Sequence, residues 1–191
     1  MKTPRLPLPH LIIIGLLLLT SCGDTQYEYS SRTCYFVFDN SVHNDATLAA
    51  AMTPYSGVFT QVTLATHGGA NYFVFQSNQG NTSEAIYNAI DSRRTQILGM
   101  NQGLIVGYGS LSDPLVFYAF DRECPNCFDP DAIPIRSHPL QMDTRGIATC
   151  SLCKRSYDLN NGGIITQGEA GNKLTRYRAS TTGPYGVISV N

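Results

Sequence analysis

The chain has 191 residues, of which 13 are Lys or Arg and 14 are Asp or Glu, so its formal net charge is −1. This low and balanced charge, without a basic run, argues against nucleic acid as a partner. The absence of Trp, together with 17 Gly and 11 Tyr, favours β structure with many turns.

A signal peptide is expected over residues 1–21. Lys2 and Arg5 give it a positive start, and the apolar run 11–19 is as long as a signal-peptide core, roughly 7–15 residues. The run is shorter than the ~20 residues that span a bilayer as a helix. Residues 19–22, Leu-Thr-Ser-Cys, resemble the bacterial lipobox. That resemblance implies cleavage before Cys22 and acylation of Cys22; the alternative is a short buried helix in a cytosolic protein.

We therefore expect a lipoprotein of the bacterial cell envelope that faces the periplasm or the cell surface. The lipid on Cys22 would bind the protein to the membrane. Each CH₂ of an acyl chain that is buried in the membrane contributes about 0.8 kcal/mol to this anchoring. The polar residues 22–33 are expected to form a tether, and 34–191 a single β domain.

Four elements are expected in the first half of this domain. Apolar and β-branched runs predict strands, and Pro54 ends a short helical stretch because proline disfavours helix at the residue before it. The elements are a strand over 34–38, one or two helical turns over 47–52, a hairpin of strands 58–64 and 71–75 turning at 67–69, and a short helix within 83–98.

The second half of the chain predicts strands almost throughout. A strand pair is expected at 103–108 and 114–120, and a hairpin at 155–159 and 163–166. The turn of this hairpin is Asn160-Asn161-Gly162, where Asn-Gly tolerates the positive φ angles that a tight hairpin needs. Two further strands are expected over 174–179 and 185–190.

Four cysteines form two C-x-x-C pairs. Cys124 and Cys127 make the first pair, Cys150 and Cys153 the second, and the 22 residues 128–149 separate them. This pattern is typical of a zinc site in which two tight turns aim four sulfurs at one point. A tetrahedral set of four sulfurs suits Zn²⁺ or iron–sulfur chemistry.

Other roles for these cysteines stay open at this stage. An exported protein meets an oxidising compartment, so disulfides within or between the pairs are possible. A thioredoxin-like dithiol is a third role, but it places the first cysteine at a helix N-terminus, whereas strands are expected here. Cys34 is expected to be a small buried hydrophobe. Lys154, Arg155 and His138 are expected to lie at solvated positions. Lys154 or Arg155 could alternatively donate hydrogen bonds to the thiolates.

The residues around the cysteines resemble Rieske-type proteins. Residues 116–126 resemble the strand and first cluster loop of that family, and Cys150-Ser151-Leu152-Cys153 followed by 157–159 resembles the second loop. Residues 174–177 and 186–190 resemble its last two strands. The resemblance covers about 103–191 and implies a mostly β fold. The expected architecture is an antiparallel β-sandwich with a small zinc-ribbon-like metal-binding subdomain over 121–155.

The ligands depart from the family pattern. In Rieske-type proteins two cysteines bind one iron of a [2Fe–2S] cluster and two histidines bind the other; Cys124 and Cys150 match the cysteines. Asn126 and Cys153 occupy the positions of the histidines, and Cys127 can supply the missing ligand. Four thiolates suit Zn²⁺ at least as well as iron. We therefore expect a structural zinc in a binding or accessory module.

The alternative prediction is an electron-transfer protein carrying a [2Fe–2S] cluster. The sequence shows no nucleophile, base and orienting group in a catalytic pattern, so an enzyme is not the preferred interpretation. It identifies no protein partner.

Overall fold

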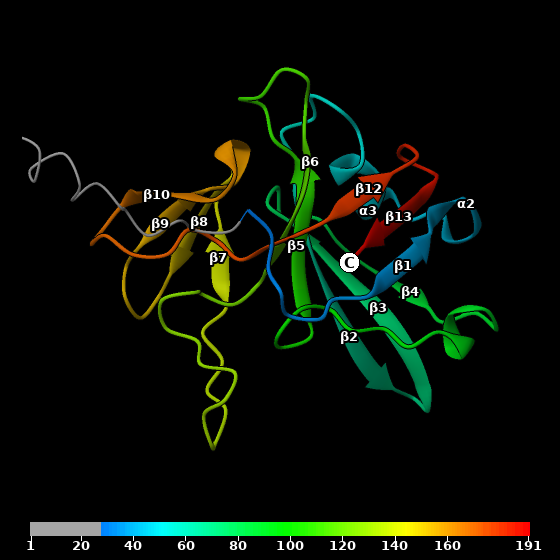
Figure 1. The fold of residues 1–191 in the computed structure, drawn as a ribbon. Coiled ribbons are helices and arrows are strands. Elements are labelled where there is room, and N and C mark those ends of the chain that lie inside the picture. Colours follow the sequence, from blue (N-terminus) through cyan, green and yellow to red (C-terminus); the bar gives the residue numbers. More distant parts are fainter. Residues whose placement is uncertain (1–27) are drawn as a thin grey trace, which may run out of the picture.

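The computed structural model describes residues 28–191 (Figure 1). The expected signal peptide 1–21 and the expected acylation site Cys22 lie outside the described residues. Within the part that is described, no helix is long and apolar enough to cross a membrane. The chain is mostly β, and all paired strands are antiparallel, which confirms the predicted fold class.

A six-stranded sheet forms the centre of the molecule. Its order is β11-β6-β5-β2-β3-β4. The expected hairpin is present: β2 and β3 are joined by Gly68 and Gly69 alone, with φ angles of +58° and +79° that match a type I′ turn. The strands are β2 (Phe59–His67), β3 (Ala70–Ser77), β4 (Thr82–Ile86), β5 (Gly103–Tyr108), β6 (Phe117–Asp121) and β11 (Arg176–Tyr177).

Two smaller sheets lie on opposite sides of this central sheet (Figure 1). One is β10-β9-β8-β7, and the other is β1-β13-β12 with two short helices beside it. The first comprises β7 (Leu140–Met142), β8 (Ile147–Cys150), β9 (Ser156–Asp158) and β10 (Ile164–Gln167). The second comprises β1 (Phe36–Asp39), β12 (Ala179–Thr181) and β13 (Val187–Val190), with α2 (Asn40–His43) and α3 (Ala46–Ala51). Two 3₁₀ turns, η1 (Asp91–Arg93) and η2 (Leu159–Asn161), complete the fold.

The middle of the six-stranded sheet is buried on both faces, which explains why its strands are apolar without alternation. Side chains along a strand point to opposite faces in turn. Leu104 and Val106 of β5 belong to the core shared with β1 and β13, whereas Ile105 between them belongs to the core shared with β7–β9. Cys124 and Cys150 are part of this second core, so the first cysteine of each pair is packed among buried side chains.

One expected element is wrong, and another is divided. The predicted helix within 83–98 is strand β4 followed by η1. Ala85 is buried while Glu84 and Ile86 are exposed, so pairing with β3 imposes a period of two on a weak helical stripe. The strand expected over 174–179 is divided at Arg178, because β11 pairs with β6 and β12 pairs with β13.

Candidate metal centre

Each cysteine pair lies in a tight turn at the end of a strand. The first turn follows β6, and the carbonyl of Cys124 accepts hydrogen bonds from the N–H groups of Cys127 at 3.1 Å and Phe128 at 2.9 Å. The second turn follows β8, where the Cys150 carbonyl accepts from the N–H of Lys154 at 3.0 Å. Lys154 has a φ of 60°, a left-handed conformation that reverses the chain. These backbone hydrogen bonds therefore direct both sulfurs of each pair toward the same side of their turn.

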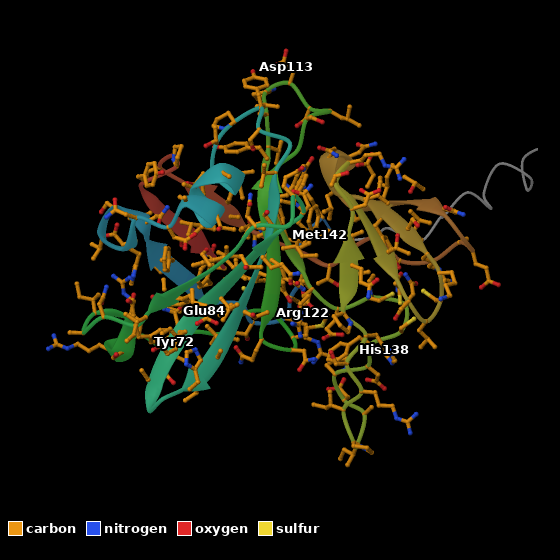
Figure 2. All side chains as sticks on the ribbon, turned by 180° about the vertical axis from the view of Figure 1, so that it is seen from behind. Tyr72, Glu84, Asp113, Arg122, His138 and Met142 are labelled. Atoms are coloured by element: carbon orange, nitrogen blue, oxygen red, sulfur yellow. The ribbon has the colours of Figure 1, made fainter. Side chains whose placement is uncertain are left out.

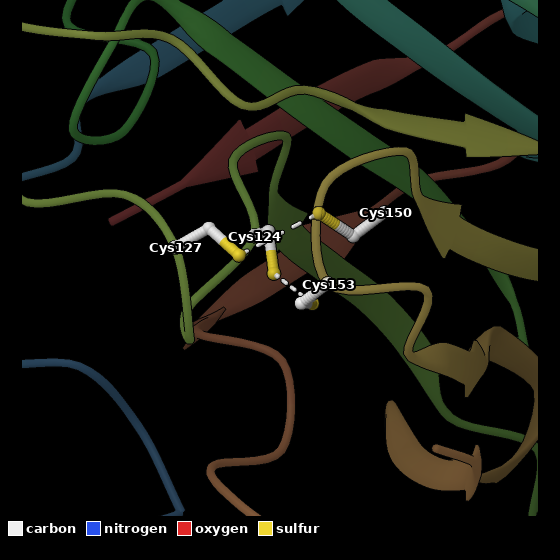
Figure 3. A group of neighbouring side chains, drawn as sticks. All are labelled: Cys124, Cys127, Cys150 and Cys153. Atoms are coloured by element: carbon white, nitrogen blue, oxygen red, sulfur yellow. Dashed lines mark hydrogen bonds between the residues drawn. The ribbon is translucent and has the colours of Figure 1, made fainter. Parts of the chain in front are cut away.

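The four sulfurs converge on one point (Figure 3). All four Sγ atoms lie within 4.8 Å of one another. The pairs Cys124–Cys153 and Cys127–Cys150 are each separated by 3.7 Å between sulfurs. Sulfurs around one tetrahedral ion with metal–sulfur bonds of about 2.3 Å would lie about 3.8 Å apart. The four-cysteine group could therefore hold one metal ion, as the spacing of the pairs predicted.

None of these cysteines forms a disulfide. The five cysteines of the described residues are all free thiols, and 3.7 Å is far beyond the bonded sulfur–sulfur distance of about 2.05 Å. Cys34 is buried with 6 % of its surface exposed, and it packs in the core shared with β1, which confirms the sequence prediction. Burial raises the pKa of its thiol to about 11, so Cys34 stays protonated and unreactive.

One side of the sulfur group is sealed by protein. Cys124 and Cys150 are fully buried, whereas Cys127 and Cys153 are partly exposed. The hydroxyl of buried Tyr157 lies 3.3 Å from the Sγ of Cys124. The amide of Asn126 donates to the same hydroxyl at 2.9 Å, which fixes its position. Asn126 thus orients a neighbour of the sulfurs.

Arg155 contacts the sulfur group, which corrects the expectation of a solvated edge. Its guanidinium lies near Cys153, and only 13 % of its side chain is exposed. Partial burial opposes ionisation of Cys153, but Arg155 and the thiols of Cys127 and Cys150 outweigh it and lower the pKa of Cys153 to about 6. Burial, together with the neighbouring thiols, raises the pKa of Cys127.

A loop over residues 168–172 covers the second turn. Arg155 donates to the carbonyls of Glu169 at 3.0 Å and Ala170 at 3.1 Å. Asn126 and the backbone of Asn172 exchange hydrogen bonds of 2.8 and 2.9 Å. Gly171 permits this approach, because a Cβ there would lie 2.4 Å from the side-chain oxygen of Asn126. The loop, the two turns and their polar side chains therefore form one connected unit.

Sequence analysis missed Glu123, a buried carboxylate directly before Cys124. One of its oxygens accepts from the Asn101 amide at 2.7 Å and from the Ser137 hydroxyl at 2.6 Å. The other accepts from the N–H of His138, and the His138 carbonyl accepts from the N–H of Cys124 at 3.0 Å. Glu123 thereby ties the ends of the long loop to the first cysteine turn. The sequence feature that could have indicated a buried role for Glu123 is its position as an acidic residue just after an apolar strand.

His138 takes part through its backbone only in this clamp. Its imidazole is not among the side chains that gather around the four sulfurs in the described part of the chain. Asp121, two residues before Glu123, accepts from the N–H of Glu123 at 2.9 Å and from the hydroxyl of Tyr177 at 2.8 Å. Burial raises the pKa of the Asp121 carboxyl despite these bonds.

No family model matches the sequence, and neither a curated protein nor a solved structure matches the chain. The Rieske-type resemblance therefore stays a prediction. The fold and the site together define an antiparallel β protein with a four-cysteine group able to hold a metal ion.

Proposed function

We propose that this chain is a lipid-anchored envelope protein in which Cys124, Cys127, Cys150 and Cys153 hold one structural Zn²⁺ within a binding or accessory module. The observation that carries the proposal is the convergence of all four sulfurs within 4.8 Å of one another. Four thiolates close the coordination sphere of Zn²⁺ and leave no open position for substrate, which is typical of structural sites.

The same distances favour one ion over a two-iron cluster. A [2Fe–2S] cluster binds its cysteines in two pairs, each pair on a different iron, so the pairs must be held further apart than ligands of a single ion. Here all four sulfurs, and not only those of one pair, lie within 4.8 Å of one another. That single tight group supports a mononuclear centre to which each turn contributes two ligands.

The proposed ion stabilises a region that has little other secondary structure. The residues between β6 and β7 contain no helix or strand, and β7–β9 are three or four residues long. One ion would connect the first turn, which starts the long loop, to the second turn between β8 and β9. Because ligands are assembled only in the folded state, metal binding energy becomes folding energy.

The metal is tested by elemental analysis of the natively exported chain together with its visible spectrum. We expect about one zinc per chain and a colourless protein. One iron per chain with visible absorbance would replace the structural role by electron transfer. Two irons with acid-labile sulfide would establish the [2Fe–2S] alternative that the Rieske-type resemblance implies. Absence of metal and of free thiols at the four positions would leave disulfides.

The lipid anchor is tested separately. Cells labelled with a radioactive fatty acid should incorporate label into the wild-type chain, and the chain should sediment with membranes. Substitution Cys22→Ala should abolish both the label and the membrane association, because the thiol is the proposed attachment point. Label or membrane binding that persists in the variant would refute the anchor without bearing on the metal.

A further inference from the structure

A polar cleft lies between the six-stranded sheet and β7, outside the four-cysteine group. It has a volume of about 390 Å³, and its lining includes Gln61 of β2, Gln76 of β3, Arg122 and, from β7, Gln141 and Met142. Figure 2 shows Arg122 and Met142 along this seam, above the loop that carries His138. Clefts of this size between rigid elements, with a few converging polar groups, are where proteins bind small ligands.

Among the described residues that line the cleft, Arg122 alone is charged, and its guanidinium makes no hydrogen bond with them. Its guanidinium makes no hydrogen bond within residues 28–191, and its Nε is buried without a partner. Its nearest anion is Glu123, at 3.7 Å, and the oxygen concerned already accepts from Asn101 and Ser137. Only 23 % of the side chain is exposed. The contact with Glu123 compensates the charge of Arg122 but is too long for a hydrogen bond, so the buried N–H groups cost free energy unless a ligand accepts from them.

The backbone holds this guanidinium in place. A Cβ at Gly103 of β5 would lie 2.7 Å from the Nε of Arg122, so only glycine lets the side chain lie flat across the strand. The N–H of Arg122 donates to the carbonyl of Gly103 at 3.0 Å, and the Arg122 carbonyl accepts from Leu140 of β7 at 2.9 Å. Both walls of the cleft are therefore fixed relative to the cation.

Three amide side chains line the same cleft as Arg122 and likewise make no hydrogen bond within the described residues. Gln61, Gln76 and Gln141 make no side-chain hydrogen bond within the described chain, although all three stand on strands. An amide side chain offers one acceptor and two donors, so it can pair with both the N–H and the carbonyl of a peptide group. Arginine matches a carboxylate with two parallel hydrogen bonds. Met142 adds an apolar wall.

We infer that this cleft binds a small peptide-like ligand through its free carboxylate, with Arg122 engaging the carboxylate and the glutamines engaging adjacent amide groups. The site is independent of the metal proposal, because none of the four cysteines lines the cleft. A simple inorganic anion would use Arg122 but leave the three amides without function, so a ligand with amide groups fits the lining better.

The test is isothermal titration calorimetry of the full chain with acetyl-alanyl-alanine and with the same dipeptide as its C-terminal amide. We expect saturable binding of the free acid and binding of the amide at least tenfold weaker, a difference of about 1.4 kcal/mol. Arg122→Gln should weaken binding of the acid at least tenfold. Gln76→Glu, at an exposed position of the cleft, should do the same by placing a second carboxylate there.

Matched controls make each outcome decisive. Arg93→Gln changes an exposed arginine of η1 in the same way and should leave binding unchanged. The inference is overturned if the amide binds as tightly as the acid, or if inorganic phosphate binds as tightly as the acid. It is also overturned if no heat is detected up to about 10 mM ligand, which is weaker than any ordinary specific site. Should Arg122→Gln fail to fold, Gln76→Glu and the acid–amide pair still decide the question.

Discussion

Replacing Glu123 with Gln tests whether the buried carboxylate holds the first cysteine turn. The substitution preserves the shape of the side chain and removes its charge. Glu123 is fully buried, and its two oxygens accept three hydrogen bonds, from Asn101, Ser137 and the backbone of His138. A glutamine has one acceptor oxygen, so it cannot satisfy all three donors in the same arrangement.

The size of the effect follows from which bonds survive. If the amide oxygen faces the His138 N–H, the new NH₂ group faces Ser137 and Asn101. The Ser137 hydroxyl can rotate to accept, and Asn101 can turn its amide, so those contacts persist as neutral hydrogen bonds. The main loss is the charge assistance, since hydrogen bonds to a charged group contribute ≈ 1.5–3 kcal/mol against about 1 for neutral ones. We expect a loss of about 2 kcal/mol in the free energy of unfolding.

The assays are urea unfolding and thermal unfolding of the metal-loaded protein, with metal release followed by a chromogenic chelator. At about 2 kcal/mol the melting temperature should fall by ~4–8 °C for a chain of this size. Metal should be released faster, because the His138 carbonyl that holds the N–H of Cys124 is anchored through Glu123. Glu84→Gln is the matched control, because the side chain of Glu84 is 47 % exposed. This substitution should lower the free energy of unfolding by no more than about 0.5 kcal/mol. Equal stability and equal metal release in the two variants would refute the role of Glu123.

Three further predictions follow from the site. Any single Cys→Ser change among the four ligand cysteines should abolish tight metal binding and lower thermal stability, whereas Cys34→Ser should keep the metal; elemental analysis decides, and retention of metal by a ligand variant would contradict the shared centre. Tyr157→Phe removes the hydroxyl 3.3 Å from Cys124 and should speed metal release measurably without unfolding the protein; an unchanged release rate would show that the contact has no role. The third concerns pH. Burial raises the pKa of Asp121 above its unfolded value, so its contribution to stability is full below the unfolded pKa, about 3.9, and is lost as pH rises through the folded pKa. The stability of the wild type relative to Asp121→Asn should therefore decline as pH is raised from about 4, and a difference independent of pH would refute this.

The sequence predicted most of the strands because local patterns agree with the fold. The β2–β3 hairpin follows from two β-branched and aromatic runs joined at Gly68 and Gly69. The hairpin of β9 and β10 is present where the sequence predicted it, but its turn differs: residues 159–161 form a 3₁₀ turn, and the positive φ angles fall on Gly162 and Gly163 and not on Asn161. The segment 83–98 was mispredicted although its pairing partner, β3, directly precedes β4 in the chain, because pairing with β3 overrides the weak helical periodicity of the segment.

The division at Arg178 has the same cause. Residues 174–179 alternate as one strand would, yet Tyr177 pairs with Ala119 and Ala179 pairs with Val190, in different sheets. Alternation reports which side chains are buried and does not say which neighbour buries them.

By itself, the sequence determined the mostly β antiparallel class and the grouping of four cysteines, because strand alternation, turn residues and C-x-x-C spacing are local properties of the chain. Only the tertiary structure decided what surrounds the sulfurs. Tyr157, Arg155 and the clamp of Glu123 lie around them because β6, β8 and β9 meet at one core, and the contacts join residues up to 33 positions apart. That the guanidinium of Arg122 makes no hydrogen bond within residues 28–191 could be seen only once two sheets formed a cleft around it. Which groups form a hydrogen bond depends on their positions in the folded structure, and local sequence patterns do not specify those positions.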